Sequence, residues 1–382
     1  MKAPITEKTT RQRRKTLDTL QQSLSQAQTW LLAARKENDV LEREAEWLTL
    51  RLARTSEQVQ RLQQQEERQD AIGFIGASLS GKAWLAEGVA QKRHEENKPV
   101  SGVSSHFTSD VHPPLTSLRF STSASAPAAA PLQLTLLQEH EVIVVLIMAW
   151  QERHTTKSAF PVTGTMTSKM QRALNARQTT LTGGITEQQV IALWESLEIL
   201  NAGRQVLPDL GVWYGLWQIL PFLTIEDRAT LLAPWWGEDE TLTQLYRQLA
   251  YALKQMAFSE TVFANEDLIG HPTVSLFNGT LPVQDVAGNE QRVTVSVKKG
   301  RSSLSHFEIA TLDLLLLCRE IVFSSRHEDE VKPPTEADRV IYPSEEKVVL
   351  KLSDPVVDFL TARKRYSLLR NAQYQEMDLL VV

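Results

Sequence analysis

The sequence predicts an α/β protein with a P-loop NTPase-like fold: an incomplete G-like domain, an N-terminal helical hairpin or coiled coil, and a large, mainly helical insertion. Three observations support this fold class. A Gly/Ser-rich loop carrying a lysine stands between an apolar segment and a helical one. A heptad repeat fills the chain before that loop. Helical patterns then occupy residues 165–265, and strand patterns follow them.

The heptad repeat places apolar side chains at alternating steps of three and four residues, so it needs a partner helix. Asp39 followed by Glu42 resembles a capping box, which would start a second helix and favours a hairpin. A continuous rod that dimerises and a helix packed on a globular domain are the alternatives. The fourteen heptad positions are Leu17, Leu20, Leu24, Ala27, Leu31, Ala34, Asn38, Leu41, Ala45, Leu48, Leu52, Thr55, Val59 and Leu62.

The Gly/Ser-rich loop matches a phosphate-binding loop except at its last position, where Ala83 replaces the usual Ser or Thr. Residues 71–75 read as a buried strand before it, and 82–90 as a helix after it. Backbone N–H groups and the Lys82 ammonium would bind phosphate, but the hydroxyl that anchors Mg²⁺ is missing. An ordinary strand-to-helix turn is the alternative. The predicted nucleotide-binding residues are Gly76, Ala77, Ser78, Leu79, Ser80, Gly81, Lys82 and Ala83.

The remaining elements follow in order. Residues 98–130 read as a loop, 131–137 as a strand, and 139–152 as a buried helix. In the helical stretch, Thr186 with Gln189 predicts a helix start, and the aromatic cluster around Trp213 and Trp235 predicts core packing. Strands are expected at 273–277, 282–286 and 292–297, an apolar helix with a buried Cys318 at 307–323, and a last strand at 347–359.

These elements suggest five segments. They are a helical hairpin or coiled coil (1–70), the first part of the G-like domain (71–160), the helical insertion (161–270), a small strand and helix element with a linker (271–345), and a truncated G-like strand with the C-terminal segment (346–382).

Composition sets limits on the partners and the compartment. The chain has 382 residues, 42% of them hydrophobic, and a formal net charge of -5. That charge gives no general attraction to nucleic acid or anionic membranes. The longest apolar run, 142–150, is too short to cross a bilayer, and the N-terminus lacks a secretory signal pattern. We therefore expect a soluble, cytoplasmic protein. Glu238-Asp239-Glu240 reads as an acidic helix start.

Several stretches resemble the bacterial virulence factor SrfC family, large proteins similar to dynamin-type GTPases. The resemblance covers almost the whole of this chain but only the N-terminal part of a typical member. The stretches that carry it are residues 34–52, Ile72 to Ser78 with Gly81-Lys82, Ser101-Gly102-Val103 with His106-Phe107, Leu134 to Leu137, 231–250, and 358–363.

The resemblance implies a degenerate GTPase-like site that holds GTP or GDP. The family's Asp-Phe-Pro-Gly motif is replaced by Asp358-Phe359-Leu360-Thr361. Asp358 would then be a possible metal ligand, and Ser101 the first-switch hydroxyl. With Ala83 and Thr361 in place of motif residues, Mg²⁺ would be held weakly and hydrolysis would be slow or absent.

Three functions remain open from the sequence. The first is a virulence-associated protein whose degenerate loop holds nucleotide with slow or absent hydrolysis, and which acts through conformation and partner contact. The others are an active dynamin-like GTPase and a structural subunit that binds no nucleotide. The expected partners are a helical protein or a second copy, bound through residues 17–62. The resemblance adds companion virulence-factor proteins as partners. It also implies that the cytoplasm is a bacterial one, with delivery to a host left open.

Overall fold

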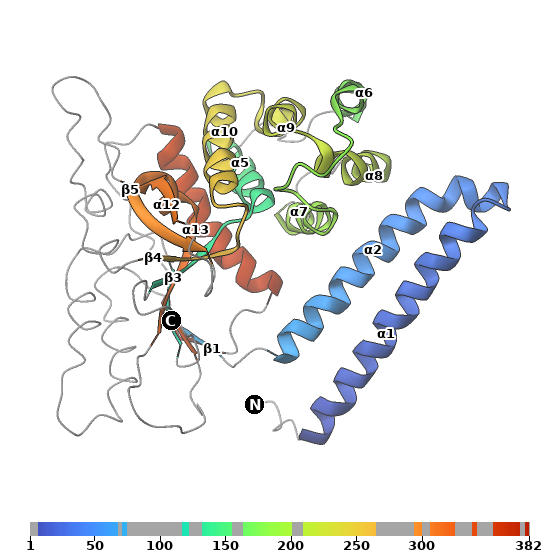
Figure 1. Ribbon diagram of the computed structural model, residues 1–382, viewed down its shortest axis with the longest axis horizontal. Helices are drawn as coiled ribbons and strands as arrows, with labels where there is room; N and C mark the ends of the chain where they lie inside the picture. Colours follow the sequence, from blue (N-terminus) through green and yellow to red (C-terminus); the bar gives the residue numbers. More distant parts are fainter. Residues whose placement is uncertain are drawn as a thin grey trace. The chain divides into compact units, whose positions relative to one another are not determined.

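The computed structural model describes residues 7–67, 71–74, 117–121, 132–154, 163–200, 209–264, 294–299, 306–324, 338–341, 354–374 and 379–381 (Figure 1). The described elements form two compact units. Unit 1 joins the two N-terminal helices to the helices between residues 163 and 235, and unit 2 contains the sheet and the helices packed on it.

Unit 1 begins with an antiparallel hairpin of α1 (Glu7–Ala34) and α2 (Asp39–Glu67) (Figure 1). The hairpin alternative is therefore confirmed, and the continuous rod is wrong. The predicted cap is off by one residue, because the Asn38 side chain accepts hydrogen bonds from the backbone N–H groups of Val40 and Leu41 at 2.9 and 3.2 Å. Asn38 thus ends the turn and starts α2.

The other helices of unit 1 are α6 (Thr163–Ala176), α7 (Glu187–Leu200), α8 (Leu210–Ile219) and α9 (Ile225–Leu232). The 3-10 turn η1 (Leu220–Phe222) joins α8 to α9. The capping box at α7 is confirmed, since Thr186 and Gln189 exchange side-chain to backbone hydrogen bonds.

The aromatic cluster of unit 1 is core, as predicted. Trp213 is buried, stacks on Trp194 at 5.8 Å between ring centroids, and meets Trp235 edge-on at 5.5 Å. Arg228 on α9 is also fully buried, and it donates to the carbonyl oxygens of Leu223 and Gly183. The buried guanidinium therefore ties α9 to the loop before α7.

Unit 2 contains a nine-stranded mixed sheet in the order β6-β5-β4-β3-β7-β2-β8-β1-β9. β3 is antiparallel to both neighbours, and Leu134 faces Val262 on β4 and Ile321 on β7. β1 is parallel to β8 and β9, and β2 is parallel to β7 but antiparallel to β8. The strands are β1 (Ala71–Phe74), β2 (Ser117–Ser121), β3 (Leu132–Leu136), β4 (Thr261–Ala264), β5 (Thr294–Lys299), β6 (His306–Ala310), β7 (Cys318–Ser324), β8 (Asp338–Ile341) and β9 (Leu379–Val381).

The helices of unit 2 that the structure describes are α5 (Glu139–Arg153), α10 (Glu240–Gln255), α12 (Thr311–Leu317) and α13 (Asp354–Tyr374). The apolar run of residues 142–150 forms the buried middle of α5, between α10 and α13. Among the described residues, no helix combines the length and apolar character that a membrane span requires. The run is thus a core helix of unit 2.

Two predicted elements are wrong. Residues 307–323 form a strand, a short helix and another strand instead of one apolar helix, with Cys318 buried as the first residue of β7. Asp354 to Phe359 opens α13 instead of ending a strand, with Pro355 in the first turn, where a missing N–H costs nothing. In both segments the apolar run is too short for its pattern to show whether it forms a strand or a helix. The strands expected at 273–277 and 282–286 lie outside the described residues.

The predicted fold class, a P-loop NTPase-like α/β fold with an incomplete G-like domain, is also wrong. Helices make up most of the described residues, and the strands whose side chains are described, β4, β3 and β7, form an antiparallel unit. No solved structure matches the chain. A strand followed by a Gly-rich loop is a local pattern, whereas the directions of paired strands depend on residues far apart in the sequence.

Candidate functional site

The predicted nucleotide-binding residues, Gly76 to Ala83, and the predicted switch residue Ser101 lie outside the described residues. The strand before the loop is described: β1 ends at Phe74, two residues before Gly76, and pairs in parallel with β8 and β9.

The possible metal ligand Asp358 lies in the second turn of α13, where its carboxylate forms an ion pair with Arg153 of α5. Burial, together with the nearby carboxylates of Asp354 and Asp239, raises the pKa of Asp358 although Arg153 acts to lower it. Thr361 is on the same helix, and its hydroxyl donates to the carbonyl oxygen of Val357 at 2.9 Å. Asp358 therefore pairs with a neighbouring helix, and Thr361 bonds within its own helix. Within the described ranges, no group of three or more His, Cys, Asp or Glu side chains could hold a metal ion.

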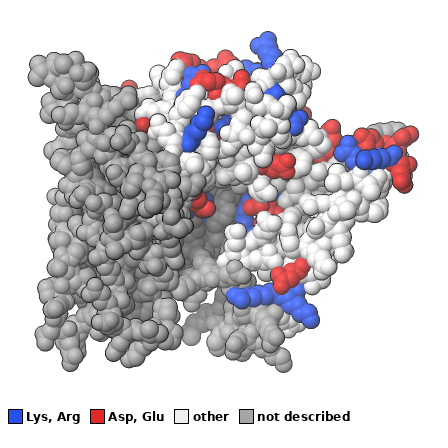
Figure 2. Space-filling view, in the orientation of Figure 1, with Lys and Arg blue, Asp and Glu red and all other residues white. Residues whose placement is uncertain are grey.

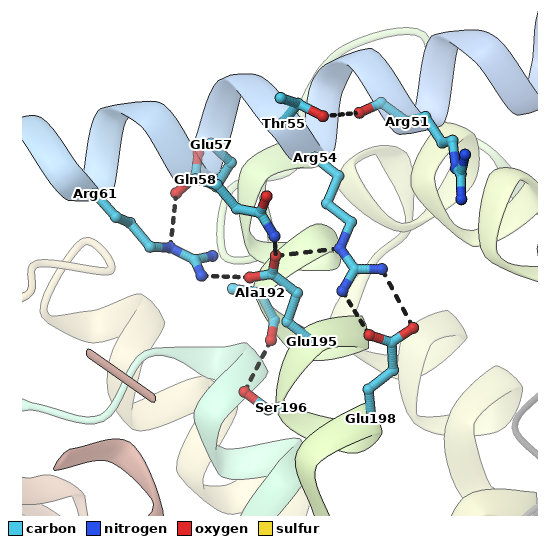
Figure 3. Close-up of polar contacts among 10 residues, drawn as sticks. All are labelled: Arg51, Arg54, Thr55, Glu57, Gln58, Arg61, Ala192, Glu195, Ser196 and Glu198. Carbon is cyan, nitrogen blue, oxygen red and sulfur yellow. Dashed lines mark hydrogen bonds and ion pairs between the residues drawn. The ribbon is translucent and has the colours of Figure 1, made fainter. Parts of the chain in front are cut away.

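The most developed polar cluster of unit 1 joins α2 to α7 (Figure 3). Glu195 is only 6% exposed, and its carboxylate accepts hydrogen bonds from Arg54 at 3.2 Å, from Gln58 at 3.0 Å and from Arg61. One turn further along α7, the Glu198 carboxylate accepts a hydrogen bond from each terminal nitrogen of Arg54, at 3.2 and 2.5 Å. Such forked pairs fix the orientation as well as the distance of the two helices. We call these five residues the α2–α7 anchor.

The anchor pairs two arginines with two glutamates of α7, and Glu57 of α2 adds a further carboxylate beside Arg61. Burial lowers the pKa of Arg54, but Glu198 and Glu195 outweigh burial and raise it overall. Arg54 also stacks over the Trp194 ring, with its Cζ 4.4 Å from the ring centroid. Burial raises the pKa of Glu57, which pairs with Arg61 at 3.6 Å. The anchor therefore holds α2 firmly on α7.

The two sides of the hairpin differ in character. On one side, polar side chains bond across from α1 to α2: Gln21 to Ser56 at 2.8 Å, Asp18 to Gln63 at 2.9 Å and Arg35 to Glu42 at 3.2 Å. All six of these residues directly follow a heptad position. We call this side the polar face, and its residues are Asp18, Gln21, Arg35, Glu42, Ser56 and Gln63.

Large apolar side chains are exposed on the opposite side. Trp30, Val40 and Trp47 each directly precede a heptad position, so they point away from the polar face. They are 60%, 65% and 36% exposed. Two heptad leucines, Leu20 and Leu62, are also exposed, at 46% and 48%. We call Trp30, Val40 and Trp47 the open face.

Charge is also unevenly distributed along the hairpin. Residues 19–34 of α1 contain no Lys, Arg, Asp or Glu. The charged residues of α1 all come before residue 19, and the turn after it begins with Arg35; Figure 2 shows an uncharged surface between these two ends. A solvated helix face is usually rich in charge, so this stretch, about 24 Å long at 1.5 Å per residue, is typical of a packing surface.

Unit 2 has its own buried charge cluster at the start of α5. Glu141 is 1% exposed, and its Oε1 accepts hydrogen bonds from Tyr366 at 3.0 Å, Arg319 at 3.3 Å and Arg370. Burial acts to raise the pKa of Glu141, but Arg370 and Arg319 prevail and lower it to about 2. The carboxylate therefore stays ionised and links α5 to β7 and α13.

Fold and site together define a mainly helical protein that presents an anchored helical hairpin with one apolar, exposed face. Residues 27–344 match the model of a family described as "Putative bacterial virulence factor", and the chain belongs to that family. No curated protein matches the chain.

The sequence contained two signals for this site that motif searching missed. Val40, Trp47, Arg54 and Arg61 recur every seven residues, each one position before a heptad residue. Two members of this series, Val40 and Trp47, lie on the open face of α2, and the other two, Arg54 and Arg61, bond to Glu195 of α7. Glu195 and Glu198 are spaced three apart, so they project from one side of α7. Neither signal identifies the partner element without the tertiary structure.

Proposed function

We propose that this protein is a helix-mediated interaction subunit of a virulence-associated assembly, and that it binds its partner through the open face of the N-terminal hairpin. The observation that carries the proposal is the open face itself, where Trp30 and Val40 are more than half exposed. On the polar face, by contrast, side chains of α1 and α2 are hydrogen-bonded to each other. Exposed large apolar side chains that gather on one face mark interaction sites.

The α2–α7 anchor supports the proposal. Flexible binding elements pay an ordering cost when they bind, and a helix pair already fixed on its own unit avoids that cost. Arg54 and Arg61 hold α2 against α7 through partly buried ion pairs, so the hairpin is presented in one orientation relative to the rest of unit 1. The closer relation to SrfC, and companion virulence-factor proteins as partners, belong to this proposal.

A photo-crosslinking experiment tests it. A benzophenone amino acid at position 40, on the open face, should give a higher-mass adduct when bacteria that make the full chain are irradiated. The matched control is position 32, because Leu32 is 55% exposed but directly follows a heptad residue and so lies on the polar-face side. Equal adducts from both positions, or none from position 40, would overturn the proposal.

A second candidate function is binding of GTP or GDP by Gly76 to Ala83, with Mg²⁺ contributing little and hydrolysis slow or absent. One observation favours it: β1 ends at Phe74, so the loop follows a strand as phosphate-binding loops do. Ser101 and Asp358 remain proposed auxiliary residues. The active GTPase alternative would require Mg²⁺-dependent phosphate release that Asp358→Ala abolishes.

Titration with GTP and GDP, each with and without Mg²⁺, tests this candidate. We expect binding that is insensitive to Mg²⁺ and that Lys82→Ala removes. Lys98→Ala, a lysine outside the motif, is the matched control and should leave binding unchanged. Absence of binding in the wild-type protein would leave only the interaction function.

A further inference from the structure

We propose that the outer side of α1 pairs with the same surface on a second copy of this chain, antiparallel and about a two-fold axis at Gln26. This inference goes beyond the proposed function, because it uses the outer side of α1 and not Val40 or Trp47. Three features of α1 support it: the spacing of its exposed residues, the bonding of its hydroxyl groups, and the charges at its two ends.

The outer side of α1 is the side turned away from α2. In unit 1, α2 packs on both α1 and α7 and lies between them (Figure 1). The α2–α7 anchor is therefore on the far side of α2, and a helix placed against the outer side of α1 does not meet it. We call the residues that define this surface the outer stripe. All of them are exposed, and they are Lys15, Thr19, Gln22, Gln26, Trp30, Ala33 and Glu37.

The spacing of the outer stripe is the same in both directions. Its residues follow one another in steps of four, three, four, four, three and four, so the spacing is symmetric about Gln26. Steps of three and four keep residues on one side of a helix. In an antiparallel pair centred at Gln26, each residue therefore meets a stripe residue of the other copy, as an isologous interface requires. The facing pairs are Gln26 with itself, Gln22 with Trp30, Thr19 with Ala33, and Lys15 with Glu37.

Hydroxyl groups on this part of α1 are bonded within the helix. Thr19 donates to the carbonyl oxygen of Lys15 at 2.8 Å, and Thr29 donates to that of Ser25 at 2.9 Å. A hydroxyl bonded to its own backbone loses little when water leaves the surface. Burying this side of α1 therefore costs less than its polar composition suggests.

The centre of the outer stripe is compatible with its own copy. Two copies of one surface repel where the same charge falls opposite itself, and residues 19–34 carry no charge. Trp30, which is 60% exposed, would cover Gln22 of the other copy on both sides of the axis. Large aromatic side chains of this kind dominate the binding energy of interfaces. Thr19 and Ala33 are small, so the two helices can approach closely where they face each other.

The two ends of this surface differ in charge. Residues 7–18 contain five basic and two acidic residues, whereas residues 35–46 contain five acidic and three basic ones. An antiparallel copy places each basic end beside the acidic turn of the other chain, and a parallel copy would bring like ends together. Lys15 and Glu37 lie eleven residues before and after Gln26, so they would form two equivalent ion pairs. This complementarity identifies the partner as a second copy.

Disulfide crosslinking of the purified full-length chain tests the pairing. Gln26→Cys should form a disulfide-linked dimer under mild oxidation, because a cysteine on the axis faces its own copy. Leu32→Cys is the matched control and should not crosslink, since Leu32 is exposed but lies on the polar-face side. The native Cys318 is buried and should not interfere. Equal crosslinking of the two variants would overturn the inference.

A pair of variants tests the register. Thr19→Cys alone and Ala33→Cys alone should stay largely uncrosslinked, because the two equivalent cysteines would be about 21 Å apart at 1.5 Å per residue. An equimolar mixture should crosslink, since each cysteine then faces the other. If either variant alone crosslinks as fast as the mixture, the antiparallel arrangement is wrong.

Sedimentation equilibrium measures the same association without new cysteines. The wild-type protein should form a dimer that weakens as salt is added. Lys15→Glu and Glu37→Lys should each weaken it about tenfold, because two attractive pairs become repulsive. An equimolar mixture of these two variants should recover the wild-type affinity, since every facing pair is again opposite in charge.

The failure of this inference is distinguishable from that of the proposed function. A wild-type monomer, or charge variants that dimerise as tightly as the wild type, would overturn the pairing of α1 with its copy. If the protein is monomeric but position 40 crosslinks to a different protein in bacteria, the proposed function holds and only the second-copy partner is wrong.

Discussion

At the scale of single residues, Glu141 has the most constrained charge in unit 2. Its carboxylate is buried and bonded to Tyr366, Arg319 and Arg370. Removing one member of a buried charge group leaves the others uncompensated. Glu141→Gln should therefore lower the free energy of unfolding by about 3 kcal/mol, measured by urea denaturation. Glu152→Gln, on the same helix with an exposed Arg365 partner, should cost about 0.5 kcal/mol or less.

The same residue gives a pH dependence with a definite sign. The pKa of Glu141 is about 2 in the folded protein, against a reference value of 4.5. Because the folded pKa is depressed, the stabilisation is complete above about pH 4.5 and is lost as the pH falls toward 2. We expect the wild-type protein to lose about 3 kcal/mol over this range and Glu141→Gln to lose less. Parallel curves for the two proteins would contradict the assignment.

Gly237 provides a second prediction at this scale. Its φ is +65°, and an added Cβ would lie 2.5 Å from Nε1 of the buried Trp150 ring. Gly237→Ala should therefore destabilise unit 2 by about 2–3 kcal/mol, from overpacking and backbone strain together. Gly164→Ala is the control, because a Cβ at that position meets no atom within 4 Å. A neutral Gly237→Ala in urea denaturation would show that the Trp150 ring moves freely.

At the scale of elements, the α2–α7 anchor determines how firmly the hairpin is held. Glu195→Gln leaves Arg54 and Arg61 without their shared carboxylate. We expect a loss of about 2–3 kcal/mol, less than for a fully buried pair, since both arginines are partly solvated. Hydrogen exchange of the α7 backbone amides should report it as faster exchange. Glu198→Gln, whose side chain is 36% exposed, should have a smaller effect.

Element types were predictable where the sequence had a long period or a capping pattern. The heptad repeat predicted both hairpin helices, and Thr186 with Gln189 predicted the start of α7. Short apolar segments were not predictable in the same way. Residues 307–323 divide into strand, helix and strand, because burial on several sides makes every position apolar whatever its conformation.

The candidate site was predicted only in part. The sequence indicated residues 17–62 as a contact segment, and the open face lies within it. It did not indicate Glu195 or Glu198, which lie more than 130 residues further along the chain and reach α2 only through the fold. Asp358 was chosen as a motif residue, yet it is on a helix and bonds to Arg153.

At the scale of the whole molecule, the two compact units separate the two charge clusters. Glu141 and its partners belong to unit 2, and Glu195 and its partners to unit 1. Since the two residues share no partner, Glu141→Gln and Glu195→Gln should have additive effects, within about 0.5 kcal/mol. Hydrogen exchange of the double variant measures this, with the amides of α5 and α7 followed separately. A large deviation from additivity would mean that the units unfold as one.

The sequence by itself determined the local features of this protein: the paired N-terminal helices, the buried helix at 139–152 and the aromatic core of unit 1. Each depends on side chains close together in the chain, whose spacing sets which face is apolar. Only the tertiary structure decided the strand order and directions in the sheet, the helix at Asp358, and the anchor that holds α2. Those features depend on contacts between residues far apart in the sequence, which no local pattern specifies.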